Sequence, residues 1–117
     1  MNLAEVCLLT KDVPGLAAFY KKILKTASDC EDDVHQAIKT DGALLTIYNN
    51  GEVSDNKNEN LFLAFTVDDV EEEYKRLKGI GVKILEPPTT RPWGARNLIF
   101  EDPDGNRVAF RSFPVLS

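Results

Sequence analysis

The feature that most constrains the fold is an imperfect internal repeat. The pair Asp12-Val13 separates a strand-like segment from a helix-like one, and Asp69-Val70 does the same 57 residues later. The pair Asp41-Gly42 separates two strand-like segments, and Asp104-Gly105 does so 63 residues later. Each pair alone is common enough to recur by chance. The matching order of strand, capped helix and hairpin instead favours a duplicated unit.

The first unit is predicted as a strand, a helix and two further strands. Leu3–Thr10 is strand-like, and Asp12 is placed to cap a helix whose first turn holds Pro14. Val34–Lys39 and Ala43–Tyr48 read as strands joined by a tight Asp-Gly turn. The sequence therefore begins with one compact unit over residues 1–49.

The second unit repeats this order. Leu61–Val67 is strand-like, Asp69 and Glu72 form a predicted capping box, and Gly79 is placed to end the helix. Three more strands are predicted at Val82–Leu85, Asn97–Glu101 and Arg107–Phe113. The unequal repeat spacings place a short insertion in this unit, in the loop from Pro87 to Gly94.

Residues 50–60 are almost entirely polar and are predicted to link the two units. We therefore expect one domain over residues 1–117, with module one at 1–49 and module two at 61–117. Its length is that of a single small domain.

Composition narrows the function classes. A net charge of −5 argues against a nucleic acid or an anionic membrane as partner, and no apolar run reaches the ~20 residues of a membrane span. Cys7 and Cys30 are too few for a disulfide framework and match no zinc spacing. The first ten residues lack the features of a signal peptide, so we expect a cytoplasmic protein.

Motifs stand out at Glu5–Val13, Ala18–Tyr20, Phe65–Val70, Pro92–Arg96 and Asp102–Asn106. Together they resemble those of one known family, the vicinal oxygen chelate proteins (glyoxalases, bleomycin-resistance proteins and extradiol dioxygenases). Glu5–Val13 resembles their opening strand and capped helix, and Ala18–Tyr20 resembles their helix signature. Phe65–Val70 resembles the start of their second module. Pro92–Arg96 followed by Asp102–Asn106 resembles their closing hairpin. The resemblance implies an α+β fold of two βαβββ modules, forming a curled mixed sheet around a small-molecule cup and usually completed by dimerisation.

The resemblance also identifies the positions that hold the metal in metal-dependent members. They fall here on Glu5, Thr46, Phe62 and Ala109, and the two repeat spacings select the same four. Of these side chains only Glu5 is a ligand that such members use, and the only histidine, His35, lies elsewhere. Because transition metals need several protein ligands, we predict no metal and no other cofactor.

Strand alternation predicts which side chains share the face of these four positions. With Glu5, the candidate ligand-binding residues on this face are Cys7, Thr46, Tyr48, Phe62, Ala64, Thr66, Arg107, Ala109 and Arg111. The residues between them are mostly apolar and are expected to pack on the helices. The alternative is that the mixed face is an ordinary solvated sheet surface.

Two further candidates carry their own alternatives. Trp93 either stacks on a flat ligand or fills one end of the core. Arg107 and Arg111 bind an anionic ligand or pair with surface carboxylates such as Glu101.

Three functions follow from this pattern. The first is metal-free binding of a small aromatic or amphipathic molecule by a homodimer. The second is a lyase, isomerase or dioxygenase-type enzyme in which Glu5 acts as the general base. The third is a degenerate family member with a structural or regulatory role.

Overall fold

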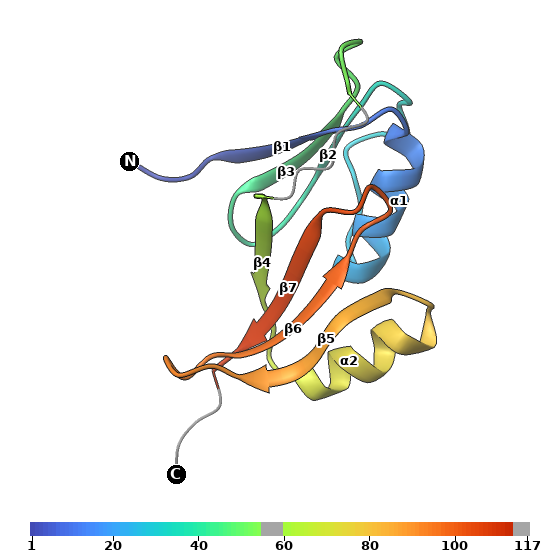
Figure 1. The fold of residues 1–117 in the computed structure, drawn as a ribbon. Helices are drawn as coiled ribbons and strands as arrows, with labels where there is room; N and C mark the ends of the chain where they lie inside the picture. The colour runs from blue at the N-terminus through green and yellow to red at the C-terminus, as the bar shows by residue number, and fades with distance from the viewer. Residues whose placement is uncertain (55–59, 114–117) are drawn as a thin grey trace. The chain divides into compact units, whose positions relative to one another are not determined.

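A computed structural model describes residues 1–54 and 60–113 of the chain (Figure 1). The chain divides into two compact units, Met1–Asn56 and Lys57–Ser117, which are called module one and module two below. The predicted linker, residues 50–60, lies partly outside the described residues, as does the end of module two beyond residue 113. Each module is described by itself.

Module one contains one helix and a mixed sheet. Its elements are β1 (Glu5–Leu9), α1 (Val13–Leu24), β2 (His35–Ile38) and β3 (Leu44–Tyr48). The strand order is β1-β3-β2, with β1 parallel and β2 antiparallel to β3. Within its described residues the module has the three strands that the sequence pattern predicts, whereas the βαβββ resemblance implies four. An isolated bridge between Ser28 and Ile38 is the only pairing formed there by the segment between α1 and β2.

Helix α1 begins where the sequence predicts. The Asp12 carboxylate accepts a hydrogen bond of 3.0 Å from the Gly15 amide, and Pro14 occupies the first turn. Its apolar stripe is buried and packs on β2 and β3 (Figure 1). The stripe consists of Val13, Leu16, Ala17, Tyr20 and Ile23.

The turn between β2 and β3 differs from the predicted tight Asp-Gly turn. Residues 39–43 connect the strands, and Gly42 does not have the positive φ of such a turn. Instead, the Thr40 hydroxyl donates to the Ala43 carbonyl at 2.6 Å and accepts from the Gly42 amide at 3.0 Å. A side chain therefore holds this loop.

Module two has a larger sheet. Its elements are β4 (Phe62–Thr66), α2 (Val70–Gly79), β5 (Lys83–Thr90), β6 (Arg96–Glu101) and β7 (Arg107–Ser112). The order is β4-β7-β6-β5, with β4 parallel to β7 and the other neighbours antiparallel. Helix α2 packs on β5, β6 and β7, so it covers one face of this sheet (Figure 1).

The two ends of α2 follow the prediction unequally. The Asp69 carboxylate caps the helix, accepting from the amides of Glu71 at 3.0 Å and Glu72 at 3.3 Å. Gly79, however, is the last helical residue, and Gly81 adopts the left-handed φ of 84°. The Val82 amide then donates to the Leu77 carbonyl at 3.0 Å. The left-handed glycine that closes the helix is therefore Gly81, two residues after the predicted Gly79.

Strand β5 is longer than predicted and runs through Pro87 and Pro88. Proline cannot donate to a sheet, but β5 is an edge strand, and its pairing with β6 shifts register on both sides of Glu86. The predicted insertion, from Pro87 to Gly94, therefore forms the irregular end of β5 as well as a loop.

Strand pairing confirms the internal repeat. In module one the parallel register runs from Glu5 opposite Leu44 to Leu9 opposite Tyr48. In module two it runs from Phe62 opposite Arg107 to Thr66 opposite Arg111. The sequence spacings of 57 and 63 residues carry the first register onto the second, so the two parallel pairs are equivalent.

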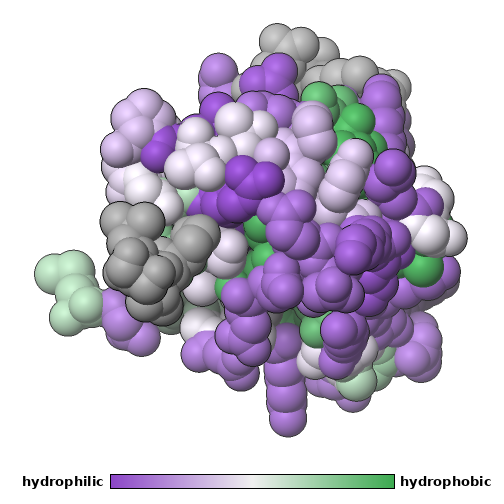
Figure 2. All heavy atoms as spheres, turned by 90° about the horizontal axis from the view of Figure 1, so that it is seen from below, coloured by the Kyte–Doolittle hydropathy of each residue, from purple (hydrophilic) through white to green (hydrophobic). Residues whose placement is uncertain are grey.

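Seen from below, the surface is dominated by hydrophilic residues, and hydrophobic ones appear only as small separate areas (Figure 2). Among the described residues, no helix is long and apolar enough to cross a membrane.

Candidate functional site

The candidate residues of module one lie on the sheet face opposite α1. On this face Cys7 of β1 lies opposite Thr46 of β3. Thr46 is only 1% exposed, whereas Glu5 and Cys7 are exposed and Tyr48 is partly buried. The face therefore combines open strand β1 with a buried centre on β3.

Glu5 is solvent-exposed and lies opposite Leu44. Within residues 1–54 and 60–113 the structure gives its carboxylate no hydrogen bond and no ion pair. Module one by itself therefore neither shields this carboxylate nor positions it through a neighbour.

The candidate residues of module two form cross-strand pairs on the face opposite α2. Phe62 lies opposite Arg107, Ala64 opposite Ala109, and Thr66 opposite Arg111. Phe62 is 48% exposed and Ala109 only 1%, and the remaining members of these pairs are exposed. Phe62 is a large apolar side chain left open on a sheet face beside a cation.

Arg107 does not pair with Glu101, although the two are opposite each other in β7 and β6. The Glu101 carboxylate instead forms an ion pair with the Lys83 ammonium group at 3.2 Å. The Arg107 guanidinium has no ion pair or hydrogen bond with any described residue.

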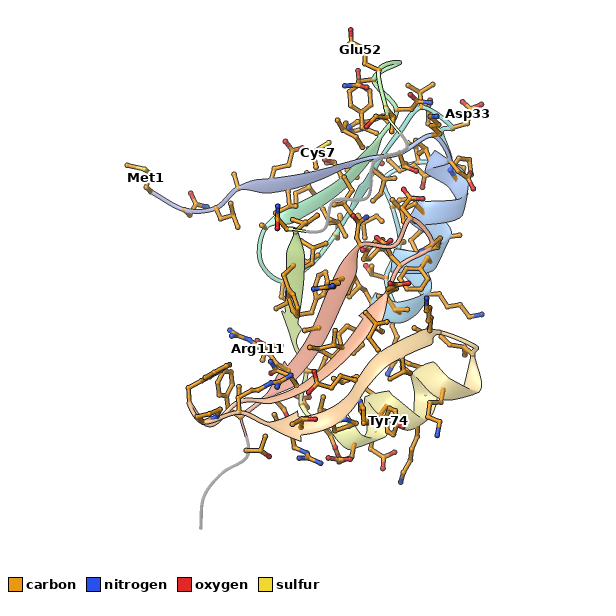
Figure 3. All side chains as sticks on the ribbon, in the orientation of Figure 1. Met1, Cys7, Asp33, Glu52, Tyr74 and Arg111 are labelled. Carbon is orange, nitrogen blue, oxygen red and sulfur yellow. The ribbon has the colours of Figure 1, made fainter. Side chains whose placement is uncertain are left out.

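Arg111 has two contacts, neither of them with a carboxylate. Its Nε donates to the Thr66 hydroxyl at 3.3 Å, and its guanidinium lies 5.0 Å from the centre of the Phe113 ring. Figure 3 shows Arg111 on the side of this sheet away from α2, the helix that carries Tyr74. The cation therefore lies on the candidate face.

Trp93 is 71% exposed, in the loop between β5 and β6. The loop is closed by hydrogen bonds from the Arg91 amide to the Ala95 carbonyl at 2.7 Å and from the Gly94 amide to the Arg91 carbonyl at 3.0 Å. Gly94 takes a φ of 97°, which favours glycine. Trp93 thus does not fill the core of its module.

This same loop carries a strong charge contact. The Arg91 guanidinium donates to the Glu86 carboxylate at 2.7 Å. This hydrogen bond holds the pKa of Glu86 below its ordinary value. It fixes the base of the loop that presents Trp93.

Several residues on these faces were absent from the predicted set, including Asn97 and His35. Asn97 of β6 lies opposite Arg111, and His35 of β2 lies opposite Tyr48, with ring centres 5.5 Å apart. The alternation of Asn97 with buried Leu98 in the predicted strand is the signal that would have found the first. The hairpin pairing of His35 would have found the second.

The donor set does not fit a metal ion. The four positions supply one carboxylate, one hydroxyl, a phenyl ring and a methyl group: Glu5, Thr46, Phe62 and Ala109. Among the described residues, no group of three or more His, Cys, Asp or Glu side chains is arranged to hold an ion. A divalent transition metal needs more nitrogen, oxygen or sulfur ligands than this.

The fold and the repeat have counterparts among known proteins. The sequence profile of the Glyoxalase/Bleomycin resistance protein/Dioxygenase superfamily matches residues 2–110. The chain belongs to this superfamily.

Solved structures of similar proteins support this assignment. One, described only as a conserved domain protein, is 28% identical with a TM-score of 0.86, covering 97% of this chain and 100% of that one. A family enzyme from Burkholderia phytofirmans PsJN is 16% identical with a TM-score of 0.81 over the same shares. A lactoylglutathione lyase from Agrobacterium tumefaciens is 20% identical with a TM-score of 0.75, covering 93% of this chain and 91% of that one. At these low identities, the last two similarities show only that the proteins share the fold of this chain.

Proposed function

We propose that this chain binds a small aromatic or amphipathic molecule, without a metal, on the sheet faces that carry the candidate residues. The observation that carries the proposal is Phe62. It replaces a metal-ligand position with an aromatic ring, and this ring is left 48% exposed on β4 opposite the unpaired Arg107. An open ring beside a cation suits a ligand with an apolar body and an anionic group.

Module one carries exposed apolar side chains on its own candidate face. Leu9 and Leu44 are 47% and 37% exposed on the sheet face that also carries Glu5 and Cys7. Large apolar side chains gathered on one face often mark a binding surface. We propose that Glu5 is a polar lining group of this surface.

The enzymatic alternative has less support. A carboxylate that acts as a general base near neutral pH usually needs shielding from water, which raises its proton affinity. Glu5 is exposed in its module and has no partner among the described residues. No contact in the described chain prepares it for proton transfer.

Calorimetric titration with naphthalene-2-sulfonate tests the proposal, with methanesulfonate as the non-aromatic control. We expect saturable binding of the aromatic probe only. Phe62→Ser should weaken it about tenfold, since ~1.4 kcal/mol is a typical share for one aromatic contact. Ile80→Ser, which changes an exposed residue at the end of α2, should leave it unchanged. Glu5→Gln should change it less than about fivefold.

Absence of saturable binding, or equal effects of Phe62→Ser and Ile80→Ser, would overturn the proposal. Loss of a catalysed turnover with unaltered binding in Glu5→Gln would instead favour the enzymatic alternative.

We also propose that the chain acts as a homodimer. Each module sheet ends in edge strands, β1 and β2 in one and β4 and β5 in the other, and paired subunits are a common way to protect such edges. Light scattering should give twice the chain mass of 13.1 kDa at micromolar concentration. A mass near that of one chain would contradict the proposal.

A further inference from the structure

Four polar side chains form one row across the exposed sheet face of module two. Strand register places in this row Thr66 of β4, Arg111 of β7, Asn97 of β6 and Thr89 of β5. The next row on the same face is apolar through its centre, with Ala64, Ala109 and Ile99. One end of this face is therefore polar and borders an apolar strip.

Within this row, the Asn97 side chain has a hydrogen-bond acceptor without a donor. Its side-chain Oδ1 is buried and has no donor among the described residues. Its neighbours in the row donate elsewhere, Arg111 Nε to Thr66 and the Thr89 hydroxyl to the Pro87 carbonyl at 2.8 Å. A buried acceptor without a donor is uncommon in folded proteins and destabilises them. A bound molecule with an N–H or O–H group would supply what this oxygen lacks.

Beside Asn97, Arg111 offers an uncommitted positive charge. It is exposed, and its described contacts are a hydroxyl and an aromatic ring. A carboxylate would form a stronger, two-pronged pair with this guanidinium than either contact does. Because these contacts are weak, an anion can replace them as the partner of this guanidinium.

Aromatic side chains extend from the same end of the sheet. Thr90 and Ser112 both lie opposite Arg96, so the loop that carries Trp93 and the residue Phe113 leave the sheet there. Trp93 and Phe113 are 71% and 53% exposed. The polar row thus has apolar contact surface on both sides.

We infer that this row recognises an aromatic carboxylate with a hydrogen-bond donor on the adjacent ring position. The carboxylate pairs with Arg111, the neighbouring N–H or O–H donates to Asn97 Oδ1, and the ring lies on the apolar strip. This inference rests on the proposed function and names the ligand class for it.

The test uses 2-aminobenzoate, with benzoate and aniline as probes that lack one of its two groups. Affinities come from amide chemical-shift changes of the full ¹⁵N-labelled chain. We expect 2-aminobenzoate to bind at least about tenfold more tightly than either relative. The largest shifts should fall in β6 and β7.

Two arginine variants separate local recognition from general charge. Arg111→Gln should weaken 2-aminobenzoate binding at least about tenfold, because the carboxylate loses its partner. Lys75→Gln is the control, because it removes a positive charge from an exposed side chain on α2, and it should change the affinity less than about twofold. Arg111→Lys keeps the charge without the fork and should give an intermediate loss. Equal losses in Arg111→Gln and Lys75→Gln would overturn the inference.

Asn97→Leu tests the donor contact, since leucine has nearly the same shape without the acceptor. It should abolish the preference for 2-aminobenzoate over benzoate while leaving benzoate affinity unchanged. A retained preference would overturn the assignment of Asn97. If naphthalene-2-sulfonate binds but 2-aminobenzoate shows no preference over benzoate, this inference fails and the proposed function stands. If neither probe binds, both fail.

Discussion

Thr46 and Ala109 occupy equivalent positions in the two modules, and each is only 1% exposed. Each lies on the third strand position of its parallel pair, opposite Cys7 in one case and Ala64 in the other. Thr46 adds a hydroxyl, which donates to the Val6 carbonyl at 3.5 Å. On each of these sheet faces the central position is therefore buried, while positions nearer the edge are exposed. This contrast can be tested directly.

Enlarging the buried centre should destabilise the protein. Ala109→Leu is expected to lower the free energy of unfolding by about 1–3 kcal/mol, because the added carbons have no free space at this position. Ala64→Leu is the control, since Ala64 lies directly opposite but is exposed. Urea unfolding followed by circular dichroism measures both. Equal effects would show that the two positions are packed alike.

The turn between β6 and β7 depends on one carboxylate. Asp102 is 5% exposed and accepts from the amides of Asp104 and Asn106, both at 2.9 Å, and from Asn106 Nδ2 at 2.8 Å. Asp102→Ala should lower the free energy of unfolding by about 2–3 kcal/mol, because it leaves these donors without an acceptor. Asp104→Ala, in the same turn but with an exposed side chain, should change it by less than about 0.5 kcal/mol. A comparable loss in both variants would refute this role.

Acid should weaken the segment that leads into β2. Hydrogen bonds from the backbone amides of Val34 and His35 hold the pKa of Asp32 below its ordinary value of 3.8. A carboxylate with a lowered folded-state pKa stabilises the fold above its unfolded pKa and loses this contribution as pH falls through the folded value. The stability difference between wild type and Asp32→Ala should thus be constant at neutral pH and shrink below pH 3.8.

Urea midpoints measured across the pH range follow this difference. Asp33→Ala is the control, because its exposed side chain has no hydrogen bond or ion pair with the described residues. A difference that grew with acidity, or that was matched by Asp33→Ala, would contradict the prediction.

The donor set predicts a metal-free protein. Elemental analysis of protein purified from metal-supplemented cultures should find far less than one zinc, iron, nickel or manganese per chain, since one carboxylate and one hydroxyl cannot complete a coordination shell. Thermal unfolding should accordingly be unchanged by a chelator. One tightly held ion per chain would show that ligands beyond the four equivalent positions take part.

Local signals predicted much of the fold. Asp12 and Asp69 cap the two helices as expected because a cap needs only a side-chain oxygen near the first amides. The continuation of β5 through Pro87 was not predictable, since proline ordinarily breaks a strand and only the edge position of β5 permits it. That position is a property of the sheet and not of the segment.

The candidate faces were predictable, but their exposure was not. A period of two places Phe62 and Ala109 on the same face of module two, whatever surrounds them. Whether a side chain on that face is open or covered depends on its neighbours in three dimensions, and here one is open and the other closed. Asn97 was missed because the four equivalent metal-ligand positions lie on β1, β3, β4 and β7, and the alternation argument was applied to these strands and not to β6.

The two prolines of β5 also bear on how this protein avoids aggregation. Pro87 and Pro88 lie on an outer strand, adjacent to each other, where the register is interrupted. Neither proline has an N–H that could donate to an incoming strand. The backbone of β5 is also too irregular here to pair in a regular register. Replacing the prolines would restore a regular template for cross-β growth on this side, and the irregularity can be understood as a safeguard of solubility.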